Sequence, residues 1–71
     1  MKFGNVLEFV KLCEYIVIVS EGEFFSYHTI YDAHRIREWR SHYVHAISSY
    51  GMDTLYFELE REPKEWEFFT T

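Results

Sequence analysis

The side chains best suited to chemistry lie in the middle of the chain, where histidine and glutamate recur at intervals of three and four residues. They are His34, Glu38, His42 and His45. Residues three or four apart share one face of a helix, so a helix would bring these four groups together. Imidazole and carboxylate groups on one face can bind Zn²⁺ or Ni²⁺. The alternative is a solvated helix face, and the zinc-protease motif H-E-x-x-H is absent.

The same segment carries a surplus of positive charge. Between residues 33 and 52, Arg35, Arg37 and Arg40 stand against Glu38, so three positive charges minus one negative give +2, within a chain of net charge −5. A basic helix face can contact phosphate or an acidic partner. The alternative is neutralisation by acidic strands of the same chain. The sequence leaves both interpretations open.

Residues 53–71 alternate carboxylates with apolar and aromatic side chains. The residues that we expect to contact a partner are Tyr56, Glu58, Glu60, Glu65, Trp66 and Glu67. Like charges on neighbouring strands destabilise a sheet, so a chain that carries them can have a function for them, such as binding a partner. Carboxylates arranged in this way can occupy a basic groove that normally holds nucleic acid. The alternative is that these acids keep an apolar chain soluble.

No motif in the sequence indicates catalytic chemistry. Nothing around the one cysteine, Cys13, marks an activated nucleophile, and we expect it to be a small core residue. The three glycines are isolated, so no phosphate-binding loop is present. We therefore expect no catalytic residue and no cofactor, and we expect that the protein is not an enzyme.

Two hairpins are expected to position these groups. Residues 15–20 are rich in β-branched types, and a turn with Gly22 leads to a second apolar run, which predicts a β-hairpin over 15–31. Residues 53–60 alternate between apolar and polar types, and 65–70 do so again after a turn at Pro63. This pattern predicts a second hairpin.

The segment between the hairpins predicts a helix over residues 32–51. Its apolar side chains are spaced by 3, 4, 4 and 3 residues: Ile36, Trp39, Tyr43, Ile47 and Tyr50. Asp32 stands where an N-cap is expected, and Gly51 stands just past the expected end. The competing interpretation ends the helix near Ser41 and makes 42–48 a strand.

The fold class that follows is α+β, in a single domain over residues 1–71. It has one mainly antiparallel sheet of about four strands in the order hairpin, helix, hairpin, with one amphipathic helix on one face. Residues 1–14 add a short helix, with a strand as the alternative. Residues 15–19 are apolar at every position and so face both sides of the sheet. The second face must therefore be covered by residues 1–13, a second copy or a partner.

Composition narrows the class of protein. The chain has 71 residues, of which 48% are hydrophobic and 21% aromatic, so it is not a disordered chain. Twelve acidic against seven basic residues make direct binding of nucleic acid an unfavoured function. One cysteine excludes an internal disulfide and favours the cytoplasm. We see no signal peptide and no apolar run long enough to span a membrane.

The function expected from these features is that of a non-enzymatic protein-interaction module. In size, acidity and single-sheet design the chain resembles the small accessory proteins that phages and mobile elements encode to inhibit host machinery. This resemblance is one of type and rests on no motif. Such a protein would bind a host protein surface, including a basic nucleic-acid-binding groove, or would form a homodimer. The alternative function is a small structural or sensor domain linked to zinc or nickel through the helix histidines.

Overall fold

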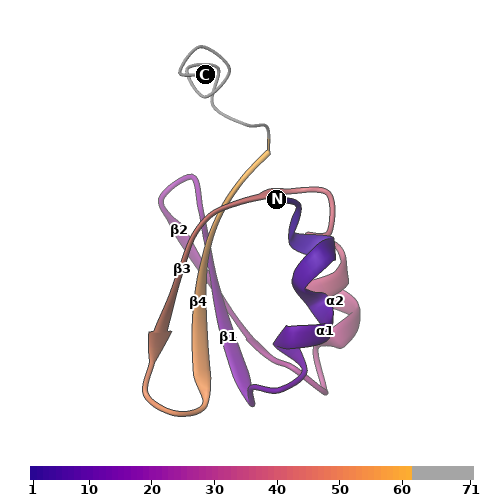
Figure 1. Cartoon of the computed structure of the whole chain (residues 1–71), viewed down its shortest axis with the longest axis vertical. Coiled ribbons are helices and arrows are strands. Elements are labelled where there is room, and N and C mark those ends of the chain that lie inside the picture. Colours follow the sequence, from indigo (N-terminus) through magenta and orange to yellow (C-terminus); the bar gives the residue numbers. More distant parts are fainter. Residues whose placement is uncertain (62–71) are drawn as a thin grey trace.

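The structure, a computed structural model, describes residues 1–61 and shows a small α+β domain with one four-stranded sheet. Short helical segments lie side by side on one face of the sheet (Figure 1). In chain order the elements are η1 (Phe3–Val6), α1 (Leu7–Val10), β1 (Tyr15–Ser20), β2 (Glu23–His28), α2 (Ala33–Arg37), β3 (Tyr43–Tyr50) and β4 (Thr54–Glu60). None of the helices in this part of the chain is long and apolar enough to cross a membrane.

The strands follow the order β2-β1-β4-β3 across the sheet. β1 pairs antiparallel with β2 and parallel with β4, and β4 pairs antiparallel with β3. The two central strands are thus neighbours in space although three elements separate them in the sequence. The expectation of four strands is confirmed, and two of the three pairings are antiparallel, but the central pairing of β1 with β4 is parallel, so the sheet is mixed.

The hairpin expected over 15–31 is confirmed by β1 and β2, which pair along their full length. The β-branched run of β1 suits a pleated strand that is packed on both sides. A two-residue turn joins the strands, and both of its residues, Glu21 and Gly22, have positive φ, at 52° and 80°. Such turns match the twist of the paired strands.

The helix expected over 32–51 is wrong in its second half. α2 spans only five residues, and 43–50 form strand β3. The competing interpretation, which ended the helix near Ser41, is the correct one. After α2, backbone N–H groups donate to carbonyls three residues earlier, as in the 3.1 Å bond from Trp39 N to Ile36 O. The helical stripe therefore ends before Tyr43.

A β-bulge explains why β3 has the apolar spacing of a helix. Val44 lies opposite Leu59 and Ile47 lies opposite Phe57, so both face the same side of the sheet although they are three residues apart. The register shifts between Val44 and Ala46, which inserts one extra residue into the strand. An alternating strand with such an insertion gives the three-residue spacing that a helix would also give.

The second expected hairpin is corrected in the same way. The strand expected at 53–60 is confirmed by β4, but its hairpin partner among the described residues is β3. Gly51, with φ of 76°, lies in the turn between these strands and does not end a helix. The strand expected at 65–70 lies outside the described residues. The expected order of hairpin, helix, hairpin is confirmed, but β3 and β4 form the second hairpin, so its residues differ from those expected.

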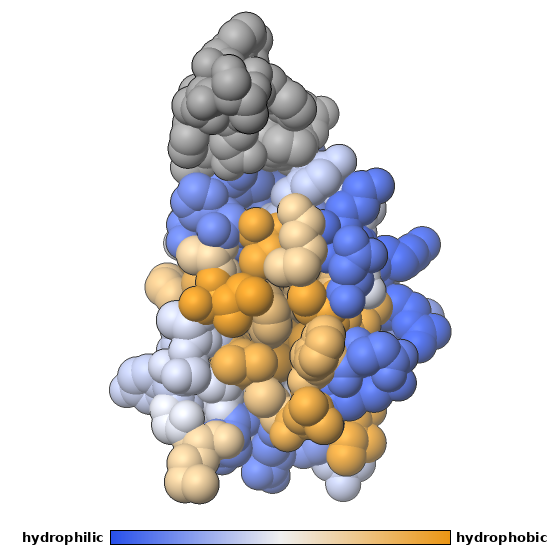
Figure 2. All heavy atoms as spheres, viewed as in Figure 1, coloured by the Kyte–Doolittle hydropathy of each residue, from blue (hydrophilic) through white to orange (hydrophobic). Residues whose placement is uncertain are grey.

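The hydrophobic core lies between the sheet and the helical segments. Its buried members are Phe3, Val6, Val10, Ile16, Ile18, Ile36, Phe57 and Leu59. The rings of Phe3 and Phe57 meet edge to face with centroids 5.1 Å apart, which joins the N-terminal helical turn to the centre of the sheet. The preference for a short helix near the N-terminus is thus confirmed. Figure 2 shows apolar residues in a band where the layers meet, with hydrophilic residues on the outer side of the helices.

Candidate functional site

The sheet has a second face, which we call the open face, that points away from the helical segments. Pairing register and burial assign twelve side chains to it: Tyr15, Val17, Val19, Phe24, Ser26, His28, Ala46, Ser48, Tyr50, Thr54, Tyr56 and Glu58. Alternation along each strand sends their neighbours, such as Ile16, Ile18 and Phe57, into the core. The helical segments of the described chain contribute to that core and so lie on the other side of the sheet.

Aromatic side chains on the open face are exposed to solvent. Phe24 is 69% exposed, Tyr50 is 71% exposed and Tyr15 is 44% exposed. The rings of Tyr50 and Tyr56 lie with their centroids 5.6 Å apart across β3 and β4. This contact positions the two tyrosine rings against each other, so the face presents aromatic surface to solvent.

A shallow hollow of about 230 Å³ lies on the open face near the end of β1. Its lining consists of Val19, Phe24, Ala46, Ser48, Tyr56 and Glu58. Register explains this grouping, because Val19 pairs with both Phe24 and Glu58, and Glu58 pairs with Ala46. The hollow therefore combines aliphatic and aromatic walls with one exposed carboxylate.

Carboxylates gather at the end of the sheet beside this hollow, which we call the acidic end. It consists of Glu21, Glu58 and Glu60, which line a second hollow of about 320 Å³ together with Arg61. Glu60 also lies 3.5 Å from Nδ1 of His45, measured from its Oε1 atom. Three carboxylates against one guanidinium give this end an excess of negative charge.

Some of the residues expected to contact a partner come together and others cannot be placed. Tyr56, Glu58 and Glu60 follow one another at alternate positions of β4 and so share the open side of the sheet. Glu65, Trp66 and Glu67 lie outside the described residues. The expectation of a larger cross-strand carboxylate cluster is therefore untested.

The basic face expected on a helix is not formed as a single stripe. Arg35 and Arg37 lie in the five-residue α2, two positions apart, and Arg40 lies in the turns that follow. The Arg40 guanidinium donates to the carbonyl of Arg37 at 3.2 Å. Within residues 1–61, none of the three arginines forms an ion pair with a carboxylate, so neutralisation by acidic strands is not seen there.

The helical spacing that suggested a metal site does not exist in the fold. His34 lies in α2, Glu38 follows it, His42 lies in the connection to β3, and His45 lies in β3 itself. The described part of the chain holds no group of three or more His, Cys, Asp or Glu side chains that can bind a metal ion together. The physical reason is the change from helix to strand, which sends residues three and four apart in different directions.

Several residues of the open face were not among the expected partner contacts. Phe24, Tyr15 and Tyr50 are the exposed large hydrophobic residues among these. A signal for them was present, because a strand that is apolar at every position must present side chains on both faces of its sheet. Tyr50 was not recognised as a surface residue of the sheet, because the sequence pattern assigned it to a helix that in fact ends before it.

Comparison of the chain with protein-family models, with curated proteins and with solved structures gives no match. The functional argument therefore depends on the geometry of the surface alone.

Proposed function

We propose that this chain is a non-enzymatic protein-interaction domain that binds a basic partner protein through the open face of its sheet. The observation that carries the proposal is one side of a four-stranded sheet with exposed aromatic side chains, continuous with the acidic end. Contiguous apolar surface of this kind is a common feature of protein interaction sites. Tyrosine is also enriched among the residues that anchor such interfaces.

Charge favours a different partner over a second copy of the chain. The chain carries a net charge of −5, and the surface beside the hollow is acidic as well. Two copies that approach through this region would repel each other, whereas a basic protein would be attracted. The partner that fits best presents an apolar strip to Val19, Phe24 and Tyr56, with lysine or arginine at its end near Glu58.

An inhibitor of a nucleic-acid-binding protein is one form of this function. In that form, Glu58 and Glu60 take the place of phosphates in a basic groove while the aromatic side chains pack beside it. Binding would be steric and would weaken as salt rises, because salt screens exposed charges.

The proposal can be tested with a random peptide library displayed on phage, which needs no knowledge of the natural partner. We expect selection on the wild-type protein to enrich peptides that combine aromatic or aliphatic residues with lysine or arginine. The test variant joins Tyr56→Ser to Glu58→Lys. The matched control joins Leu12→Ser to Glu8→Lys, because Leu12 is 83% exposed and the Glu8 side chain is equally exposed, outside the sheet.

Selected peptides should bind the test variant at least about tenfold more weakly and the control as well as the wild type, since an interface anchor typically contributes more than ~1 kcal/mol. Enrichment of acidic peptides would contradict the proposal, and so would equal loss of binding in both variants.

Sedimentation equilibrium tests whether a second copy of the chain occupies the open face. A dimer that Phe24→Ser separates into monomers would assign the face to a second copy instead.

A further inference from the structure

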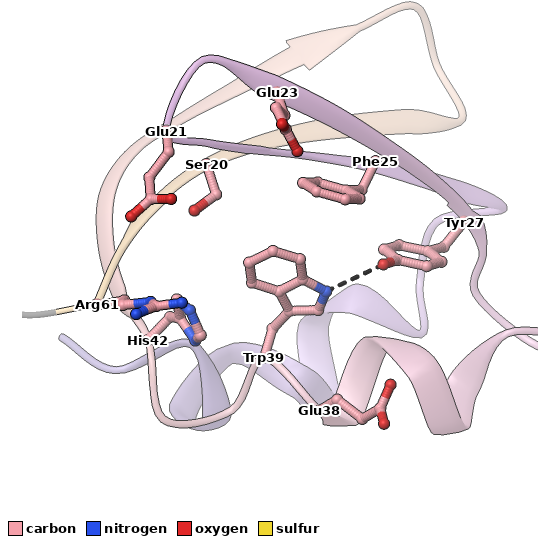
Figure 3. Close-up of a pocket in the computed structure, with 9 residues that line it drawn as sticks. All are labelled: Ser20, Glu21, Glu23, Phe25, Tyr27, Glu38, Trp39, His42 and Arg61. Carbon is pink, nitrogen blue, oxygen red and sulfur yellow. Dashed lines mark hydrogen bonds between the residues drawn. The ribbon is translucent and has the colours of Figure 1, made fainter.

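A separate hollow of about 450 Å³ lies on the helical side of the sheet, between the β1–β2 hairpin and the connection from α2 to β3 (Figure 3). Its volume falls in the range that small-ligand sites occupy. Phe25 and Tyr27 contribute from β2, and Trp39 comes from the turns after α2. Phe24 and Phe25 point to opposite faces of β2, so this hollow is distinct from the open face, although Glu21 and Arg61 line both this hollow and the hollow at the acidic end.

Aromatic rings form the wall of this hollow. The rings of Phe25 and Trp39 have centroids 5.1 Å apart and are inclined at 54°, so they meet as two sides of a corner. The indole nitrogen of Trp39 donates a hydrogen bond to the Tyr27 hydroxyl at 3.1 Å, drawn as a dashed line in Figure 3. This bond fixes the orientation of the indole and leaves the Tyr27 hydroxyl hydrogen available to another acceptor.

Carboxylates stand opposite the indole. Figure 3 shows Glu21, in the β1–β2 turn, and Glu23, at the start of β2, on the other side of the hollow from Trp39. Neither forms an ion pair within residues 1–61. Aromatic faces attract cations through their quadrupole, and carboxylates beside them add direct electrostatic attraction. A site with both groups selects a cation that has a flat or apolar surface.

A nitrogen atom of the wall also lacks a partner. Nδ1 of His42 is buried without a hydrogen-bond partner among the described residues, and the His42 ring lies 4.8 Å from that of Trp39. This atom has almost no solvent-accessible surface, so it does not open into the hollow, and the aromatic wall and the carboxylates are the groups that would contact a ligand.

We infer that this hollow binds a guanidinium group, such as that of an arginine side chain. A planar guanidinium stacks on an aromatic ring and donates to carboxylates in a fixed fork, whereas a compact, strongly hydrated ammonium does neither as well. The chain's own Arg61 lies at the edge of the hollow. Its positive charge opposes a second cation there, so removal of that charge should strengthen binding.

Titration with Nα-acetyl-arginine amide tests the inference in the full-length chain. The chain has two tryptophans, so a Trp66→Phe background leaves Trp39 as the only one. We expect a saturable shift of the Trp39 indole N–H resonance, with a dissociation constant near ~1 mM, a reasonable strength for one side chain. Nα-acetyl-citrulline amide, which has the same shape without charge, should bind at least about tenfold more weakly, and the lysine analogue should fall between the two.

Variants separate the groups of the site. The pair Glu21→Gln and Glu23→Gln should weaken binding at least about fivefold, and Arg61→Gln should strengthen it, because the charge changes have opposite sign. Leu12→Ser and Glu8→Gln are the controls and should leave binding unchanged, because both side chains are exposed and lie outside the sheet. An amide fingerprint spectrum of each variant shows whether it is folded. A shift that never saturates, equal binding of the citrulline compound, or no effect of the paired glutamate variants would overturn the inference.

Discussion

Glu21 occupies a backbone position that most residues avoid. Its φ of 52° lies in the left-handed region, next to Gly22 at 80°. A residue with a Cβ atom is disfavoured there by about 1–2 kcal/mol, and asparagine is tolerated better than glutamate. Nothing lies within 4 Å of where a Cβ atom on Gly22 would be, so crowding has no part in that preference. The stability of this turn is therefore limited by the backbone conformation at Glu21 and not by steric crowding.

The first prediction is that Glu21→Asn raises the free energy of unfolding by about 0.5–1 kcal/mol, because asparagine suits the turn. Urea unfolding measures this change.

Gly22→Ala should lower the free energy of unfolding by about 1–2 kcal/mol, since alanine must adopt positive φ at this position although nothing crowds its side chain. If the inferred guanidinium site is correct, the more stable Glu21→Asn variant should also bind that group more weakly. An unchanged or lower stability of Glu21→Asn would show that the φ of this position does not limit the fold.

At the scale of elements, the sequence could predict what depends on local chemistry. The β1–β2 hairpin follows from a β-branched run and one glycine, and β4 follows from clean alternation. Asp32 also stands at the start of α2, although its carboxylate accepts a 2.8 Å hydrogen bond from the backbone N–H of His28 rather than from the helix. The start of the helix was thus predictable, but the role of its first side chain was not.

The fate of β3 depends on information that lies elsewhere in the chain. Its spacing of three between Val44 and Ile47 arises from a bulge, and only the register against β4 shows this. Because β1 and β4 lie in parallel at the centre of the sheet, β4 has a free edge that β3 fills. Periodicity within 43–50 cannot reveal a pairing with 54–60, and so the helix and the histidine cluster were both predicted wrongly.

The second prediction compares the two faces of one strand. Ile18 is fully buried under the helical segments, whereas its neighbour Val19 is half-buried on the open face. Ile18→Ala should lower the free energy of unfolding by about 2–5 kcal/mol, because it leaves a cavity in the core. Val19→Ala removes two carbons from a surface that water already reaches, so its effect should stay near ~1 kcal/mol.

Urea unfolding of the dilute protein measures both changes. Similar losses for Ile18→Ala and Val19→Ala would contradict the assignment of faces, because they would mean that the open face is packed as closely as the core. Repetition at high protein concentration adds a control. A greater loss from Val19→Ala at high concentration would indicate that a second copy covers the face.

At the scale of the whole molecule, the sheet formed by residues 1–61 has one face covered by helical segments and one open face that the described residues leave exposed to water. The candidate surface was predictable in part, since Tyr56, Glu58 and Glu60 do share one side of β4. That Phe24 and Tyr15 belong to the same surface follows only from the pairing of β1 with β4, which the sequence did not predict. A patch that spans several strands is a property of strand order, which composition and local spacing do not encode.

The third prediction concerns the balance between this patch and the net charge. The chain has an isoelectric point near 5.2, so the repulsion between copies that exists at pH 7 disappears as the pH falls towards that value. Association is favoured when net charge approaches zero, and exposed apolar patches then supply the contact. We expect light scattering to rise as the pH is lowered from 7 towards 5.2.

Phe24→Ser should suppress that rise, since it removes an exposed ring from the open face without changing the charge. Leu12→Ser is the matched control, because Leu12 is exposed to a similar degree, 83% against 69% for Phe24, and lies outside the sheet. If copies associate through the open face, only Phe24→Ser should keep light scattering low near pH 5.2. Equal suppression by Leu12→Ser would mean that exposed apolar side chains act singly, and the open face would lose its distinction as a contact surface.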